Sequence, residues 1–191
     1  MLRLAAWLRG GALALGLFTL ASPIPASAQV SVSMETGQLL ANDGLSPGQY
    51  RWQPEAATAT GTLSIVVSTT LQRAYVFRGS TLIWVTTVST GQPGYDTPTG
   101  RFTILEKAVT HRSSLYEDAP MPFMQRLTWD GVALHAGQIP RSGEPASHGC
   151  IRLPRAFAQR LYEMSALGTV VLVTDATPET PEEALTLASA G

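Results

Sequence analysis

Residues 135–152 read HAGQIPRSGEPASHGCIR, and they concentrate the reactive side chains of the protein. The stretch holds the only cysteine of the 191-residue chain, Cys150, and two of its three histidines, His135 and His148. A cysteine attacks as its thiolate, and a nearby imidazolium can lower the thiol pKa from about 8.5 to below neutral. A cysteine and a histidine that meet in the fold are the minimal pair for nucleophilic catalysis. The stretch therefore predicts an active site built on a thiol.

The residues before His135 indicate how this histidine is presented. The segment LTWDGVALH at 127–135 contains Asp130-Gly131, a strong hairpin signal. The strand after this turn ends at His135, and strand alternation places Ala133 and His135 on one face. A histidine at a strand end beside a glycine-rich loop is well placed to point into a cleft. The following loop is long enough to return the thiol to the imidazole.

The flanking sequence predicts a mostly β domain. Apolar and β-branched runs predict strands at 63–68, 73–78, 81–88, 101–105 and 169–173. Short strands at this spacing favour an antiparallel sheet. Apolar residues at helical spacing, with a proline at the start, predict a helix over 154–164. The length favours one domain, and the net charge of −1 argues against a nucleic-acid binder.

Two motifs together resemble a known family. His135, a glycine-rich connection and then Ser147-His148-Gly149-Cys150 before an aliphatic residue resemble the catalytic signature of the L,D-transpeptidases, the YkuD domain. The segments STG at 89–91 and TPTGRF at 97–102 resemble a second motif of that family. The resemblance covers roughly residues 63–173. It implies a β-sandwich catalytic domain with one or two short helices.

The resemblance implies roles for the motif residues. Cys150 would attack a carbonyl carbon to form a thioester, with His135 as the base that takes the thiol proton. His148 either organises the nucleophile's turn or is itself the base, and Ser147 is interpreted as a hydrogen-bonding residue of that turn. Backbone N–H groups around His148, Gly149 and Cys150 are candidate donors to the oxyanion. The sequence shows no evident side chain that would orient His135, so the backbone carbonyl of Ala136 is a candidate for that role.

Further residues are interpreted as substrate contacts. Arg152 can bind a substrate carboxylate or form a structural ion pair with an acidic residue. Tyr95, in the proline- and glycine-rich loop 91–100, is a candidate substrate-binding residue. The segment 111–126 carries several large apolar side chains and is interpreted as a wall of the substrate cleft, whereas His111 within it is expected to have no catalytic role.

The resemblance also implies substrates and partners. The first hypothesis is a transferase of cell-wall synthesis that acts on peptidoglycan stem peptides. It would form 3–3 cross-links, or attach a free D-amino acid or a protein as acyl acceptor. An L,D-carboxypeptidase or amidase that hydrolyses the same thioester is the first alternative, and a non-catalytic cell-wall-binding protein is the second. No cofactor is expected. A zinc site made by His135, His148 and Cys150 is the remaining alternative, although a second cysteine or a carboxylate partner is lacking.

The N-terminus predicts export. Arg3 and Arg9 precede an apolar run at 11–21, which is short for a membrane span of roughly 20 residues. The Ala-Ser-Ala at 26–28 fits a signal-peptidase site. We therefore expect a signal peptide at 1–28, no stable membrane span after its cleavage, and a location in the periplasm or cell wall. An uncleaved membrane anchor is the alternative. A single cysteine in an oxidising compartment is either a reactive thiol or an intermolecular link.

The domain organisation follows from these segments. After the signal peptide we expect a flexible lead-in at 29–61, a catalytic domain at 62–175 and a disordered tail at 176–191. The lead-in is rich in turn-forming residues, and Tyr50 and Trp52 are candidates for an edge segment within it. The tail begins with an acidic, proline-containing run and ends in small residues.

Overall fold

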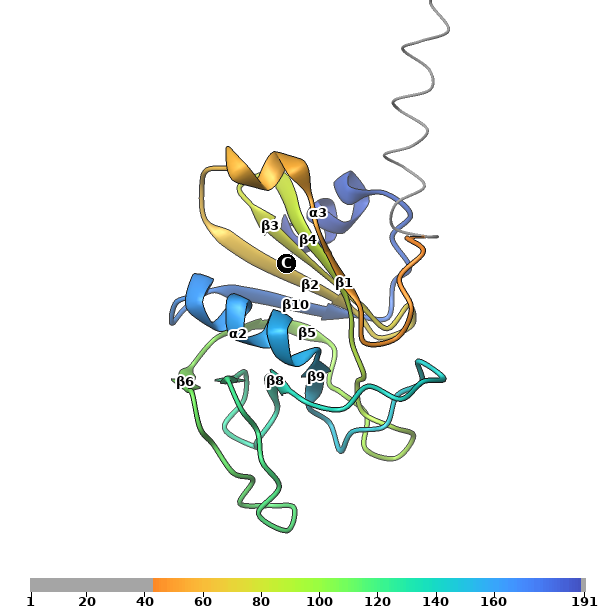
Figure 1. The fold of residues 1–191 in the computed structure, drawn as a ribbon, viewed down its shortest axis with the longest axis vertical. Helices are drawn as coiled ribbons and strands as arrows, with labels where there is room; N and C mark the ends of the chain where they lie inside the picture. Colours follow the sequence, from red (N-terminus) through yellow and green to blue (C-terminus); the bar gives the residue numbers. More distant parts are fainter. Residues whose placement is uncertain (1–42, 190–191) are drawn as a thin grey trace, which may run out of the picture.

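The computed structural model describes residues 43–189, and within this range ten strands form two sheets (Figure 1). The larger sheet has the order β1 (Tyr50–Trp52), β4 (Thr81–Thr87), β3 (Arg73–Arg78), β2 (Leu63–Ser68), β10 (Val170–Thr174) and β5 (Gly100–Thr103). The smaller sheet has the order β6 (Glu106–Ala108), β7 (Met124–Arg126), β8 (Ala133–Ala136) and β9 (Ile151–Leu153).

Helices cover both faces of the larger sheet. Helix α2 (Arg155–Met164) packs between the two sheets, and α3 (Pro181–Ser189) lies against the other face of the larger sheet (Figure 1). A 3₁₀ turn, η1 (Pro54–Ala57), follows β1. The predicted fold class, a mostly β sandwich with one or two short helices, is confirmed.

The strand sequences explain why the sheet is covered on both sides. Ile65 and Val67 of β2 face the core shared with the smaller sheet and α2. Val66, between them, faces the second core under α3. All three side chains are fully buried. Since successive strand residues point to opposite faces, a continuous apolar run requires cover on both.

Two parallel pairings correct the expectation of an antiparallel sheet. Strand β10 pairs in parallel with β2, and β8 pairs in parallel with β9. In each case a long connection brings the chain back in the same direction, as parallel pairing requires. The remaining strand pairs are antiparallel, including the predicted hairpin of β3 and β4.

The expected disordered tail at 176–191 is wrong over most of its length. Its residues from Pro181 to Ser189 form α3, whose Ala184 and Ala188 are buried against the larger sheet. Arg101 donates a hydrogen bond to the carbonyl of Ala188. The small residues that suggested a disordered end are those that allow the helix to approach the sheet closely.

The flexible lead-in is also partly wrong. From Asp43 onward the backbone is ordered, and the predicted edge segment is present as β1, which pairs antiparallel with β4. The carboxylate of Asp43 lies 2.6 Å from Nε of Arg73 and accepts the backbone N–H of Leu45. The signal peptide expected at 1–28 and the start of the lead-in lie outside the described residues. Among residues 43–189, no helix is long and apolar enough to cross a membrane.

Candidate active site

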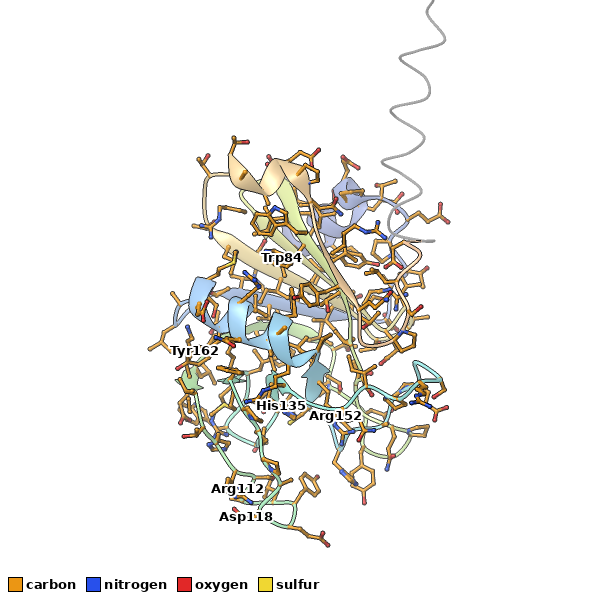
Figure 2. All side chains as sticks on the ribbon, in the orientation of Figure 1. Trp84, Arg112, Asp118, His135, Arg152 and Tyr162 are labelled. Carbon is orange, nitrogen blue, oxygen red and sulfur yellow. The ribbon has the colours of Figure 1, made fainter. Side chains whose placement is uncertain are left out.

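The smaller sheet brings the histidine and the cysteine to one cavity. Strands β8 and β9 are neighbours, with His135 opposite Arg152 in the register, and Cys150 immediately precedes β9. Figure 2 shows His135 and Arg152 close together below α2. Because the two short strands run parallel, His135 and Cys150, which are 15 positions apart in the chain, both line the same cavity as Arg152.

His135 is held in one orientation by its own backbone neighbour. Its Nδ1 lies 2.9 Å from the carbonyl oxygen of Ala136. A carbonyl only accepts, so Nδ1 carries the proton and Nε2 retains the free lone pair of a base. The side chain is 6% exposed, and burial lowers the pKa of His135 from 6.5 to about 4, with a contribution from the charge of Arg152. The imidazole is therefore neutral at physiological pH.

Cys150 is a protonated thiol in this state. Its Sγ lies 3.4 Å from the carbonyl oxygen of Gly131, which accepts the S–H. Burial raises the pKa of the Cys150 thiol, while a backbone hydrogen bond with Ala133 and the charge of Arg152 act in the opposite direction. His135 is buried and Cys150 is partly buried, so a charge on either group would be poorly solvated and both are neutral in the folded protein.

The turn that carries the thiol is closed by Ser147. Its Oγ donates to the carbonyl of Cys150 at 2.5 Å and accepts the N–H of Gly149 at 3.2 Å. Gly149 has a φ of +102°, which a residue with a side chain rarely adopts. Because the Gly149 N–H is already bonded to Ser147, it is not a free donor to an oxyanion. Of the expected donors, the backbone N–H groups of His148 and Cys150 remain.

His148 lies at the mouth of the cavity. Its ring stacks on Tyr116 with centroids 4.7 Å apart and meets the edge of Tyr95 at 4.5 Å. The side chain is exposed, in contrast to the buried His135. Tyr95 contacts the ring of His148 but does not itself line the cavity. Its role as a substrate contact stays a prediction.

The cavity has a volume of about 290 Å³ and one wall made by the segment predicted for it. Met121 and Met124 form its buried part, and Tyr116 stands at its exposed end. The interpretation of 111–126 as a cleft wall is confirmed. His111 also faces this cavity, a placement that the sequence did not indicate, and its charge contributes slightly to the lowered pKa of His135.

Arg152 brings positive charge to the floor of the cavity. Its aliphatic stem lies over Gly137, where an added Cβ would meet the Arg152 side chain at 2.8 Å. Arg126, on the same cavity, is paired with Glu106 at 2.7 Å. Among residues 43–189, Arg152 has no acidic side chain within ion-pair distance. The structure therefore does not support the interpretation of Arg152 as one partner of a structural ion pair.

The loop 91–100 and Gln72, which immediately precedes β3, support the site in ways that the sequence did not reveal. Gly91 pairs with Ser147, and the N–H of Gln92 donates to the Ser147 carbonyl. The buried amide of Gln72 accepts the N–H of Thr90 at 2.9 Å and donates to its hydroxyl at 2.6 Å. The STG and TPTGRF motifs were the only signal that this loop belongs to the site. Nothing in the sequence pointed to Gln72.

The zinc alternative has no assembled ligand set. Between residues 43 and 189, no group of three His, Cys, Asp or Glu side chains is placed to hold a metal ion. His135 is turned to Ala136, and the imidazole of His148 lies between two tyrosine rings. The cavity brings together a thiol, an imidazole and an arginine, which are groups that can serve acyl transfer.

Comparisons with solved structures find the same fold. An L,D-transpeptidase from Stackebrandtia nassauensis is 31% identical with a TM-score of 0.56, covering 64% of this chain and 60% of that one. An L,D-transpeptidase from Mycobacterium smegmatis is 25% identical with a TM-score of 0.54, covering 59% and 58%. An L,D-transpeptidase solved in complex with imipenem is 26% identical with a TM-score of 0.56, covering 59% of each chain.

The match therefore spans about three fifths of these solved chains. A search of curated proteins returns no match. A family model described as the L,D-transpeptidase catalytic domain, YkuD, matches residues 62–173, which include both sheets' central strands and every residue of the predicted catalytic pair. More than half of the chain is covered by this match, and the protein belongs to the YkuD family of L,D-transpeptidase catalytic domains.

Proposed function

We propose that this protein is an exported cysteine L,D-transpeptidase that acts on peptidoglycan stem peptides. The observation that carries the proposal is the orientation of His135. Its Nδ1–H is bound to the Ala136 carbonyl, so Nε2 is the basic nitrogen in a cavity that also holds the Cys150 thiol. A buried base, a partly buried thiol and an arginine without an acidic partner among the described residues suit attack on a peptide that carries a carboxylate.

The acylation step follows from the neutral state of the pair. His135 accepts the thiol proton at Nε2 as the sulfur attacks the carbonyl carbon of the donor, forming a C–S bond and a tetrahedral oxyanion. The intermediate collapses, the C–N bond breaks, and the leaving amine takes the proton from His135. A thioester on Cys150 remains. Proton transfer accompanies attack, since no preformed thiolate is present.

The second half-reaction returns the enzyme to its starting state. An acceptor amine attacks the thioester while His135 takes one of its protons, and the C–S bond then breaks. His135 gives that proton to the departing sulfur, which restores the thiol. With a second stem peptide as acceptor the product is a 3–3 cross-link. A free D-amino acid or a protein amine gives attachment, and water gives hydrolysis.

The assignment of His135 rather than His148 as the base is supported by their environments. His135 is buried, oriented by a carbonyl and neutral. His148 is exposed and stacked on Tyr116, which suits an organising role at the cavity mouth. Arg152 would bind a carboxylate of the donor peptide, because it lines the cavity and has no acidic partner among the described residues.

The activity is tested with the purified protein and its Cys150→Ala variant. Both are incubated with a disaccharide-tetrapeptide muropeptide, and intact protein and products are followed by mass spectrometry. We expect a thioester adduct on the wild type alone, loss of the terminal D-residue and a cross-linked dimer. Adduct followed by tripeptide alone would change the assignment to a carboxypeptidase. Absence of adduct, with equal muropeptide binding by both proteins, would favour the cell-wall-binding alternative.

Export is tested separately. We expect the mature protein to begin at Gln29, after cleavage of the Ala-Ser-Ala motif at 26–28, and to be recovered outside the cytoplasmic membrane. N-terminal sequencing of the protein from fractionated cells measures both. A protein that retains Met1 and sediments with membranes would instead support the uncleaved anchor.

A further inference from the structure

Thr97 lies behind the catalytic turn and holds it through one hydroxyl. Its side chain is 7% exposed. Its Oγ1 accepts the backbone N–H of Gly91 at 2.8 Å and donates to the carbonyl oxygen of Gly149 at 2.9 Å. The direction of the second bond is certain, because a carbonyl oxygen can only accept and a hydroxyl has a single proton.

This bond fixes a peptide plane next to the nucleophile. The Gly149–Cys150 peptide is trans, so its C=O and N–H point in opposite directions. With the Gly149 carbonyl bound to Thr97, the Cys150 N–H is directed away from Thr97. Thr97 does not line the cavity, whereas Cys150 does. Within residues 43–189, the Cys150 N–H donates to no protein acceptor.

The neighbouring donors show why this peptide matters. The Gly149 N–H is bound to Ser147, so it is not free for substrate. The Cys150 N–H, which has no acceptor in the part of the chain that the structure describes, belongs to the same residue as the attacking sulfur. A tetrahedral intermediate bonded to that sulfur places its oxyanion within reach of this N–H, the geometry in which a fixed donor stabilises developing charge.

Gly149 makes the support of Thr97 necessary. A glycine at a φ of +102° restrains the following peptide weakly, since it has no Cβ to limit rotation. The hydroxyl of Thr97 is itself well anchored, because an added Cβ on Gly91 would lie only 1.9 Å from the Tyr95 carbonyl, which shows how tightly the loop is folded. The rigid loop therefore restrains the flexible turn.

We propose that Thr97 is a positioning residue that aligns the Cys150 N–H as the oxyanion donor. The inference rests on the proposed acyl-transfer function and deepens it. It assigns Thr97 no contact with substrate and no proton transfer. Its contribution is the orientation of one peptide group before the substrate arrives, which removes the cost of reorganising that group during attack.

The test separates acyl transfer from thiol reactivity. Thr97→Val removes the hydroxyl at nearly constant size, and Thr97→Ser keeps it. Thr99→Val changes an exposed threonine of the same loop and serves as the control. Acylation by the tetrapeptide donor and by imipenem is measured by mass spectrometry. Alkylation of Cys150 by iodoacetamide is measured in parallel as a function of pH, because that displacement forms no oxyanion.

We expect Thr97→Val to slow acylation by both reagents roughly 10- to 100-fold, below the roughly 10²–10³-fold cost of losing an oxyanion donor outright. Its alkylation rate and pH profile should stay within about 2-fold of the wild type, since the mechanism of alkylation does not use the donor. Thr97→Ser should recover most of the acylation rate, and Thr99→Val should behave as wild type. Circular dichroism checks the fold, with Thr97→Ala as the substitute should Thr97→Val unfold.

Three results would overturn the proposal. Acylation of Thr97→Val at the wild-type rate would show that the hydroxyl does not align the donor. An equal loss of acylation and alkylation would show that Thr97 positions the thiol or the whole turn. A wild-type protein that is alkylated normally but acylated by neither reagent would instead overturn the proposed function, and with it the oxyanion that Thr97 is inferred to serve.

Discussion

The protonation states of Cys150 and His135 set how the site responds to pH. Burial raises the pKa of the thiol and lowers that of the imidazole. In the folded protein the proton is therefore on the sulfur of Cys150. In an imidazolium–thiolate pair it would be on a nitrogen of His135. In the proposed reaction, the proton of this S–H, which is bonded to the Gly131 carbonyl in the free protein, passes to His135.

The first prediction concerns alkylation of the free protein. Iodoacetamide reacts with the thiolate, so the rate should rise about tenfold per pH unit through neutrality and still be rising at roughly pH 8.5, the ordinary thiol range. The rate is measured by mass spectrometry at a series of pH values, with Cys150→Ala as the unreactive control. A rate that is already constant below neutral pH would contradict the neutral pair.

The second prediction concerns stability in acid. An imidazole in the unfolded chain binds its proton near pH 6.5, whereas folded His135 does so only near pH 4. The unfolded state therefore binds more protons between these values. The contribution of neutral His135 to the free energy of unfolding is fully present above about pH 6.5 and is lost as the pH falls towards 4. The loss is about 3 kcal/mol. Urea unfolding at pH 7, 5.5 and 4 measures it.

His135→Gln is the control for that experiment, because glutamine does not titrate. The variant should lose less free energy of unfolding between pH 7 and pH 4 than the wild type does, whatever its stability at neutral pH. The same loss in both proteins would show that other groups cause the acid sensitivity.

The helix α3 shows what elements contribute beyond the site. It covers Val66, Tyr75 and Phe77, which all belong to the face of the larger sheet that points away from the cavity. Removing apolar cover from such a face exposes a surface that favours association. The helix therefore stabilises the larger sheet. This sheet carries the loop 91–100 and the strand before it.

The third prediction tests this packing. Ala184→Asp places a carboxylate in the buried face of α3 and should lower the free energy of unfolding by about 3 kcal/mol. Thr186→Asp makes the same change on the exposed face, with an expected effect within about 0.5 kcal/mol. Urea denaturation of the two variants compares them. Equal stabilities would mean that α3 is not packed on the sheet.

The elements also show what could be read from the sequence. The strands of the larger sheet's centre, β8 and the helix α2 were predictable because their apolar residues recur at the spacing of the structure they form. The strands β6, β7 and β9 were not predicted, since each has only three residues. The helix α3 was missed, since its buried residues are alanines in an acidic, proline-containing run. The usable signal lay elsewhere: Ile65, Val66 and Val67 are consecutive and apolar, so both faces of their sheet required cover.

The site divides in the same way. The shared cavity of His135 and Cys150 was predictable because their spacing suits a strand and its return. Their roles as base and nucleophile stay predictions. The carbonyl of Gly131, the hydroxyl of Thr97 and the amide of Gln72 were not predictable. Each acts through a contact between segments distant in the chain, made by groups that every protein contains in abundance.

At the scale of the whole molecule, the cavity is lined by strands and loops of the smaller sheet, whereas the described chain begins beside the larger sheet. Asp43 anchors that beginning to β3 through Arg73, with its side chain 3% exposed. Figure 2 shows a second pair, Arg112 and Asp118, at the tip of the cleft-wall segment, where both side chains are mostly exposed. The two pairs thus differ in burial and in their distance from the sheet.

The fourth prediction uses this difference. Asp43→Ala leaves Arg73 half-buried without its partner and should cost about 2–3 kcal/mol of unfolding free energy, less than the 3–5 kcal/mol of a fully buried pair. Asp118→Ala should cost less than about 0.5 kcal/mol, because exposed ion pairs contribute little. Thermal and urea unfolding measure both. Comparable losses would show that burial does not distinguish the two pairs.

The hydrogen bond from Cys150 to the Gly131 carbonyl has a consequence for the lifetime of the protein. Peroxides oxidise thiolates much faster than thiols, first to sulfenic acid and then irreversibly to sulfinic and sulfonic acids. A site that keeps its sulfur protonated until a substrate enters leaves little thiolate to be oxidised during idle periods. Under the proposed function, the thiol would resist oxidation in the free protein and would become reactive only when its proton passes to His135 during attack on a substrate.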